Sequence, residues 1–172
     1  MAGEFTWFHV GRPMQVHVIA VGKIKEKYLQ EGIAEYQKRL RPYIKLTILE
    51  IAEEKRIGHL TPSDQKRIKE AEGMRIMGAI PQDSFVIVLD VNGVHWSSET
   101  LAENLHRYEI AGRNSLSIII GGDLGLSDAV IARSTVRLSL SPMTFTHQMI
   151  RLIILEQIYR ACKINHGEPY HK

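Results

Sequence analysis

The chain has 172 residues, 44% of them apolar and 24% charged. These values are ordinary for one compact globular domain, and they exclude a fibrous or generally disordered protein. The 22 Lys and Arg residues exceed the 19 Asp and Glu residues by only three. A protein that binds by covering many phosphates with a basic surface is therefore excluded, and any contact with nucleic acid must be local.

The cysteine content and the longest apolar run indicate where the protein works. The single Cys162 cannot form a disulfide within the chain and, with scattered histidines, lacks the spacing of a zinc site, so we predict no metal. The most apolar stretch, residues 149–158, is interrupted by Arg151 and Glu156 and falls short of the roughly 18 to 20 residues of a membrane span. We expect a cytoplasmic protein without a membrane segment.

Residues 1–13 have neither the basic segment nor the apolar run of a secretory signal. Met14 then opens an alternating apolar pattern that is typical of a strand. We expect residues 1–13 to be a leader or an extension derived from expression, and residues 14–172 to form a single domain.

From residue 16 onward, strand and helix patterns alternate five times. Short apolar, β-branched runs predict strands at residues 16–21, 46–51, 84–90, 116–120 and 136–140. Amphipathic spacing and capping residues predict helices at residues 28–40, 66–77, 97–112, 129–133 and 147–163. The run at 84–90 should be a central strand covered on both faces, and the helix at 66–77 should mostly face solvent. This alternation predicts an α/β domain with a mainly parallel sheet flanked by helices.

Three loops follow predicted strands at the edge where parallel sheets bind their ligands, namely residues 89–93, 121–125 and 140–146. The glycines of the second loop, GGDLG, can supply positive φ for a tight turn or let the backbone approach a ligand closely. This loop lacks the third glycine of a dinucleotide motif and the lysine of a P-loop, and Asp123 would repel a pyrophosphate. A ligand without phosphates, or one with positive charge, is compatible with it.

The last loop and the helix after it allow alternative interpretations. Met143 and Phe145 can wall an adenine pocket, although such residues before a helix are more often core. His147 and Arg151 are four residues apart and should form a polar cluster near this loop, unless His147 simply bonds the local backbone. Residues 149–158 are apolar around most of the helix, which predicts a subunit interface because a chain of this size could hardly cover them.

Polar residues also gather near both ends of the predicted domain. Tyr170 and His171 can hydrogen-bond, stack on a base or take a proton, but chain ends usually fray. Lys23, Lys25 and Lys27 are most simply a solvated helix face.

Four segments resemble the RlmH family of ribosomal RNA large-subunit methyltransferases: AVGKIKEKY, IIIGGDLGL, LSLSPMTFTHQMIRLIILEQIYRA and the terminal HGEPYHK. The resemblance extends over residues 14–172 in order and without large gaps. It implies a small SPOUT-class enzyme with an α/β fold, a C-terminal trefoil knot and a homodimeric assembly. The knot is implied by the resemblance alone, since ordinary topology rules argue against one. S-adenosylmethionine is implied as the methyl donor, and N3 of a pseudouridine in 23S rRNA, on the assembled ribosome, as the acceptor.

The resemblance also implies site residues. Matching positions in the three loops would contact the cofactor, namely Leu89, Gly121, Leu140, Ser141, Pro142, Met143, Thr144 and Phe145. Tyr170 and His171 match the terminal pair that handles the target nucleotide, so we expect both to be catalytic.

The implied reaction demands little of the side chains, because a sulfonium is already an activated methyl donor. The acceptor nitrogen must approach in line, lose its proton and be shielded from competing water. His171 or a solvent-linked group can take this proton, or an already ionised fraction of the substrate can suffice. Two rival functions remain, a non-catalytic RNA-binding or assembly factor and an enzyme that uses another adenosine ligand.

Overall fold

The computed structural model describes residues 12–172, which form one five-stranded sheet with five helices. The strands are β1 (Gln15–Val21), β2 (Lys45–Ile51), β3 (Phe85–His95), β4 (Ser115–Ile120) and β5 (Val136–Ser139). The helices are α1 (Lys27–Leu40), α2 (Pro62–Ala79), α3 (Ser98–Ile110), α4 (Asp128–Arg133) and α5 (His147–Asn165). The strand order is β2-β1-β4-β3-β5, and every neighbouring pair is parallel. The predicted α/β fold with a parallel sheet flanked by helices is confirmed.

Two expectations about the chain are not tested by this architecture. The leader expected at residues 1–13 lies outside the described residues except for its last two, so the division at residue 14 stays a prediction. The trefoil knot also stays a prediction.

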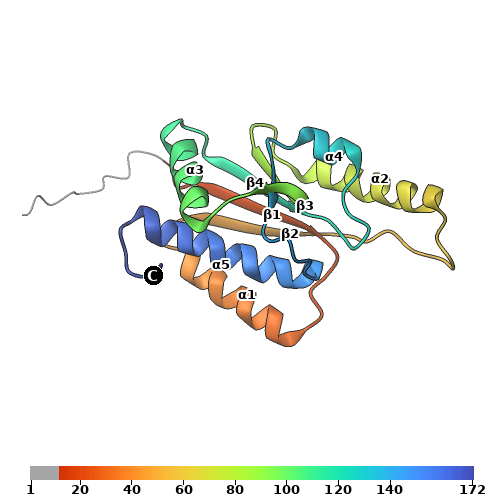
Figure 1. Ribbon diagram of the computed structural model, residues 1–172, viewed down its shortest axis with the longest axis horizontal. Helices are drawn as coiled ribbons and strands as arrows, with labels where there is room; N and C mark the ends of the chain where they lie inside the picture. The colour runs from red at the N-terminus through yellow and green to blue at the C-terminus, as the bar shows by residue number, and fades with distance from the viewer. Residues whose placement is uncertain (1–11) are drawn as a thin grey trace, which may run out of the picture.

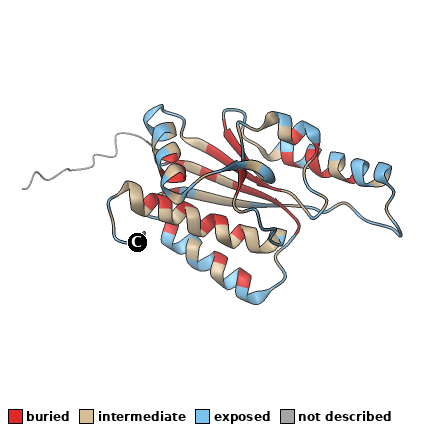
Figure 2. Cartoon of the chain, viewed as in Figure 1, coloured by how far each residue is buried: buried red, intermediate tan, exposed pale blue. Residues whose placement is uncertain are grey.

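Helices cover both faces of the sheet (Figure 1). α1, α3 and α5 lie on one face, and α2 and α4 lie on the other. The larger core lies beneath the first group, and a smaller core lies beneath the second, where Ile76 of α2 and Val130 of α4 meet the strands. The most continuous burial runs along β1 and β4 (Figure 2). β3 lies inside the sheet as predicted, between β4 and β5, although β4 holds the middle position.

The apolar surface of α5 is covered within the chain itself. Ile154, Leu155 and Ile158 are each at most 1% exposed, because α5 packs against α1, α3 and the sheet. The chain itself therefore covers the centre of this helix face, and the predicted subunit interface stays a prediction. Any partner would have to use its half-buried apolar side chains, among them Met149 and Ile153.

β3 is longer than its sequence pattern predicts. The apolar run ends at Asp90, but the strand continues to His95, with an irregularity in its pairing to β5 between Leu89 and Val94. Gly93 permits this continuation, because a Cβ atom there would lie 2.5 Å from the carbonyl oxygen of Arg137. The backbones of β3 and β5 can approach this closely only because the residue is glycine.

We expect Gly93→Ala to lower the free energy of unfolding by about 1 to 3 kcal/mol, because the added methyl group overlaps the β5 backbone. Gly78 on α2 serves as the matched control, since a Cβ atom there meets no neighbour within 4 Å. Gly78→Ala should raise the same free energy by up to about 1 kcal/mol through helix propensity. Urea unfolding followed by circular dichroism measures both variants. Wild-type stability of Gly93→Ala would contradict the close pairing of β3 and β5.

Candidate active site

A cavity of about 940 Å³ lies beyond the carboxyl ends of β3, β4 and β5. All three segments predicted to form the site contribute to its wall, together with the first turns of α1 and α5. The segment 89–93 is not a loop as predicted, because it belongs to β3, which continues to His95. The sheet edge predicted to bind a ligand is thus the edge that carries this cavity.

Most of the residues expected to contact a cofactor line this cavity. They are Leu89, Gly121, Leu140, Ser141, Met143, Thr144 and Phe145. The remaining one, Pro142, lies in the same loop and is exposed. Met143 is 73% and Phe145 is 40% exposed, so the alternative that these two are core residues is wrong. Whether the whole set contacts a cofactor stays a prediction.

The glycines of the GGDLG loop form a tight turn, one of the two uses considered, while a close approach to a ligand stays a prediction. Gly125 has a φ of 85°, and its amide donates to the carbonyl of Gly122 at 3.0 Å, which closes a tight turn. Gly121 does not have positive φ, but a Cβ atom there would lie 3.0 Å from the Leu126 side chain and 3.1 Å from the backbone of Gly125. The turn therefore folds back onto Gly121 and leaves its backbone facing the cavity.

The carboxylate of this loop is neutralised by a partner distant in sequence. Arg56, between β2 and α2, donates from both terminal nitrogens to Asp123, with Nη1 2.7 Å from Oδ2. These hydrogen bonds hold the pKa of Asp123 below its ordinary value. A second pair joins β3 to β5, where Nη2 of Arg137 donates to Oδ2 of Asp90 at 2.6 Å. The sequence analysis missed both pairs, because no local spacing connects their members.

A buried carboxylate lies behind the GGDLG loop. Glu72 of α2 is only 2% exposed, although most of this helix faces solvent as predicted. Its Oε1 accepts from the amide of Glu54 at 3.0 Å, and its Oε2 would lie 3.7 Å from a Cβ atom on Gly122. Burial raises the pKa of Glu72 above its ordinary value, while the hydrogen bond from Glu54 opposes this shift. The side chain thus holds the β2–α2 connection beside the loop.

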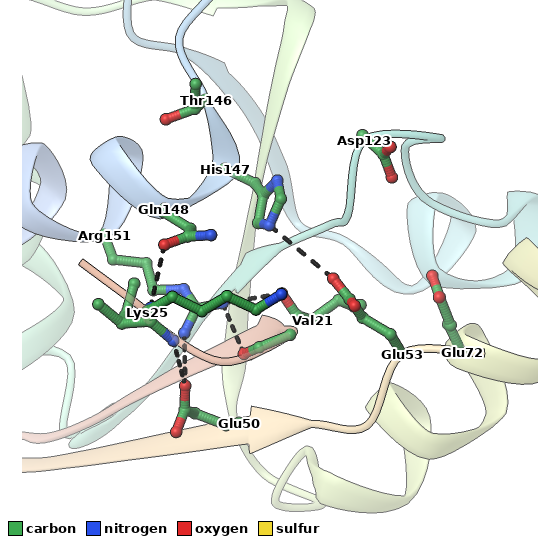
Figure 3. A network of polar contacts seen from close by, with 12 residues as sticks. Val21, Lys25, Glu50, Glu53, Glu72, Asp123, Thr146, His147, Gln148 and Arg151 are labelled. Carbon is green, nitrogen blue, oxygen red and sulfur yellow. Dashed lines mark hydrogen bonds and ion pairs between the residues drawn. The ribbon is translucent and has the colours of Figure 1, made fainter. Parts of the chain in front are cut away.

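Arg151 connects α5 to the carboxyl ends of two strands (Figure 3). Its guanidinium is 2% exposed, and Nη2 donates to the carbonyls of Val21 and Gly22 at 2.8 and 2.7 Å. Nη1 donates to Oε2 of Glu50 at 3.0 Å. Burial lowers the pKa of Arg151, and the hydrogen bond to Glu50 opposes this shift. We call this set of contacts the Arg151 clamp.

The polar cluster expected from His147 and Arg151 is divided between two places. His147 lines the cavity, and its Nε2 lies 4.0 Å from Oε1 of Glu53. Arg151 points instead toward Val21 and Glu50, so the two side chains diverge (Figure 3).

The tail residues lie at the far end of α5. Tyr170 donates to Oε1 of Glu156 at 3.1 Å and packs its ring 4.9 Å from that of Tyr159. His171 contacts Oε1 of Glu99 at 2.7 Å. Their contacts reach Glu156 and Arg160, which lie 9 and 13 residues beyond His147 at the cavity, about 14 to 20 Å along the helix at the usual rise per residue. Within one chain, the structure therefore does not bring Tyr170 and His171 to the cavity, and it shows them with partners and not frayed.

Two further findings concern residues 12–172 as a whole. None of their helices combines the length and apolarity needed to cross a bilayer. Within the same range, no group of three or more His, Cys, Asp or Glu side chains is placed to hold a metal ion.

Comparison with known proteins identifies the class of this fold. Residues 14–171 match the family model described as "Predicted SPOUT methyltransferase". A solved structure from Haemophilus influenzae, described as a probable methylase family protein, shares the fold with a TM-score of 0.53 at 10% identity, covering 91% of this chain and 70% of its own. The chain belongs to the SPOUT methyltransferase family and is an enzyme of that class.

Relatives at higher identity narrow the family further. A protein of Methanoregula boonei is 60% identical over 160 residues, which cover 92% of this chain and all of the relative. Proteins of Clostridioides difficile and Bacillus pumilus, both named ribosomal RNA large subunit methyltransferase H, are 52% and 50% identical with the same coverage. The chain is a member of this RlmH family, as its motifs indicated.

We expect Arg151→Met to lower the free energy of unfolding by about 2 to 4 kcal/mol, because it leaves two buried carbonyls without a donor. Arg39→Met is the matched control, since Arg39 pairs with Glu35 on the exposed side of α1 and should leave the unfolding midpoint almost unchanged. Unfolding of both variants in guanidinium chloride tests this expectation. A midpoint for Arg151→Met equal to that of the control would contradict a supporting role for the Arg151 clamp.

Proposed function

We propose that this enzyme transfers a methyl group from S-adenosylmethionine to N3 of a pseudouridine in 23S rRNA, acting in the cytoplasm on the assembled ribosome. One observation carries the proposal. Three loops whose motifs match the RlmH family meet around a single cavity at the carboxyl edge of the sheet. That the acceptor is RNA of the large ribosomal subunit is inferred from the names of the relatives.

The residues around the cavity fit S-adenosylmethionine. Leu140, Met143 and Phe145 present apolar surface for an adenine ring and a methionyl chain. Glu26 and Asp90 are carboxylates on the wall, which suits a ligand that carries positive charge. The wall lacks a P-loop sequence, and Arg137 on the wall and Arg56 nearby are engaged with carboxylates, so the cavity offers little to a polyphosphate. When bound, S-adenosylmethionine would supply a methyl group activated by its sulfonium.

Besides an activated methyl group, the reaction requires that the donor and the acceptor are positioned and that one proton is removed. Residues 89–92 of β3 and the loop at 140–146 would orient the donor, and the GGDLG turn would shield one side of the cavity from water. Loss of the N3 proton requires an acceptor near the target base. His171 is a candidate acceptor because an imidazole can take a proton near neutral pH, and Tyr170 can hold the base by stacking or hydrogen bonding.

A homodimer reconciles this role with the position of the tail. In one chain Tyr170 and His171 do not line the cavity and lie beside the second half of α5, so we propose that they serve the cavity of a second protomer. The half-buried apolar residues Met149 and Ile153 provide surface on α5 for such a partner. The homodimer is proposed on these grounds together with the family resemblance.

Calorimetry with S-adenosylmethionine and S-adenosylhomocysteine tests the function most directly. We expect micromolar binding, and we expect Gly121→Val to abolish it while circular dichroism stays native, because the added side chain meets Leu126 and the turn at Gly125. Gly78→Val on α2, where there is open space, should bind normally. Transfer of a radioactive methyl group to ribosomes that lack the modification then tests the acceptor.

The outcomes separate the proposal from its rivals. Binding of neither compound by the wild type would favour a non-catalytic RNA-binding or assembly factor. Binding of adenosine but not of the sulfonium compound would favour an enzyme with another ligand. Wild-type affinity in a folded Gly121→Val variant would show that the GGDLG loop is not the site.

Mixed dimers test the tail. We expect His171→Ala to lower kcat by roughly 100-fold with cofactor binding retained, since it removes a proton acceptor, and Tyr170→Phe to be milder. A dimer that combines one His171→Ala subunit with one Gly121→Val subunit should regain methylation, because the intact tail then meets the intact cavity of its partner. Inactivity of this mixture would place the tail and the cavity in one chain. Full activity of His171→Ala alone would remove the histidine from the mechanism.

A further inference from the structure

The segment between β1 and α1 carries three lysines that the fold places differently from the prediction. Lys23, Lys25 and Lys27 were interpreted as one helix face, but α1 begins only at Lys27. Lys23 and Lys25 therefore belong to a loop at the carboxyl edge of the sheet, the edge that carries the cavity. All three side chains are exposed.

Side chains from three other elements hold the backbone of this loop. The amide of Ile24 donates to Oε2 of Glu50 at 3.0 Å, and the amide of Lys25 donates to Oε1 of Gln148 at 3.3 Å (Figure 3). The carbonyl of Ile24 accepts from Nε2 of Gln30 at 2.9 Å. The lysines are thus presented by a fixed backbone, which lowers the ordering cost of binding a ligand.

These lysines are also the cations beside the cavity that remain available to a ligand. Arg56 and Arg137, on neighbouring segments of the same edge, are engaged with carboxylates. Within residues 12–172, Lys23 and Lys25 take part in no ion pair closer than 4.0 Å. Lys27 lies 3.7 Å from a glutamate of the next helical turn, and its side chain is 88% exposed. An anionic partner would therefore find unneutralised positive charge in this part of the rim.

The residues after the loop connect it to the cavity. Glu26, Tyr28 and Leu29 line the cavity wall, and Tyr28 is 60% exposed. An exposed aromatic ring next to a row of lysines is the combination that binds a nucleic-acid strand, since the cations meet phosphates and the ring stacks on a base.

We propose that Lys23, Lys25 and Lys27 form a phosphate-binding strip for the rRNA backbone next to the target nucleotide, with Tyr28 between the strip and the cavity. This inference rests on the proposed function, because it names the surface by which that acceptor is held. A strip of three lysines also agrees with the low net charge of +3, which requires contacts with RNA to be local.

The triple variant K23A/K25A/K27A tests the strip. For methylation of purified ribosomes we expect KM to rise about tenfold or more with kcat within about twofold, because phosphate contacts supply binding and not chemistry. The slope of log affinity for large ribosomal subunits against log salt concentration should fall by about 2, as expected for the loss of three phosphate contacts. Calorimetry should show unchanged affinity for S-adenosylmethionine.

The triple variant K38A/K45A/K66A is the matched control. It removes the same charge from exposed lysines on α1, β2 and α2, none of which lines the cavity. We expect its KM and salt slope to equal those of the wild type. Equal losses in the two variants would overturn the proposal, because they would show a general effect of net charge.

Photocrosslinking identifies the partner of the strip. Lys25 is replaced by p-benzoylphenylalanine and the protein is irradiated with large ribosomal subunits. Crosslinks to 23S rRNA support the proposal, whereas crosslinks only to a ribosomal protein overturn it in favour of an acidic protein surface. The binding and crosslinking assays require no methyl transfer. An inactive wild type would therefore refute the proposed function while leaving the strip testable, and an active enzyme with an unchanged salt slope in K23A/K25A/K27A would refute only the strip.

Discussion

The buried guanidinium of Arg151 is the interaction on which the candidate active site depends. Its terminal nitrogens donate to the carbonyls of Val21 and Gly22 at the end of β1, and to the carboxylate of Glu50, next to the last residue of β2. Taking a guanidinium out of water is costly, and three acceptors offset that cost only because their geometry is fixed by the sheet. Nε of Arg151 has no hydrogen-bond partner among the described residues, so even this arrangement is incompletely satisfied. An apolar residue would pack more simply there, but it could not fix the start of α5 relative to β1. α5 begins at the cavity, and the loop with Lys23 and Lys25 follows β1. The Arg151 clamp therefore helps to fix the positions of both.

The sequence was informative where local physics decides the structure. Five apolar runs became five strands, and the helix expected from residue 97 begins there, with Ser97 as its N-cap. The sequence was uninformative where contacts with a distant segment determine the local structure. The continuation of β3 past Asp90 depends on a close approach to β5, and an isolated glycine does not reveal which backbone it meets. Lys23 and Lys25 were wrongly placed on a helix face for a similar reason, since α1 begins only at Lys27 and its N-cap residue Glu26 makes no side-chain capping bond that a pattern could signal.

The candidate site shows the same division. The rule that ligands lie beyond the carboxyl ends of parallel strands selected the three loops that line the cavity. Periodicity could not show that α5 packs against α1 and α3. A helix that is buried by its own chain and one that is buried by a partner subunit have the same apolar pattern. Nor could it reveal the pair of Arg56 and Asp123, which are 67 residues apart. Sequence reasoning had treated Asp123 as a bare charge that repels anions, whereas the structure shows it largely neutralised.

The neutralisation of Asp123 helps to explain how one edge of the sheet can bind two ligands of opposite charge. A cationic methyl donor favours carboxylates on the wall, and a polyanionic acceptor favours lysines at the rim. If Asp90 and Asp123 lacked their arginines, their field would extend to the rim within the screening length of about 8 to 10 Å and weaken any phosphate contact there. Pairing them confines their charge to short range, so the carboxylates can still act on a group inside the cavity. The loop that carries Lys23 and Lys25, whose backbone is held by Glu50 and Gln148, keeps these two charges exposed and without an ion pair among the described residues. A protein with a net charge of +3 can then attract RNA at one place without being basic overall.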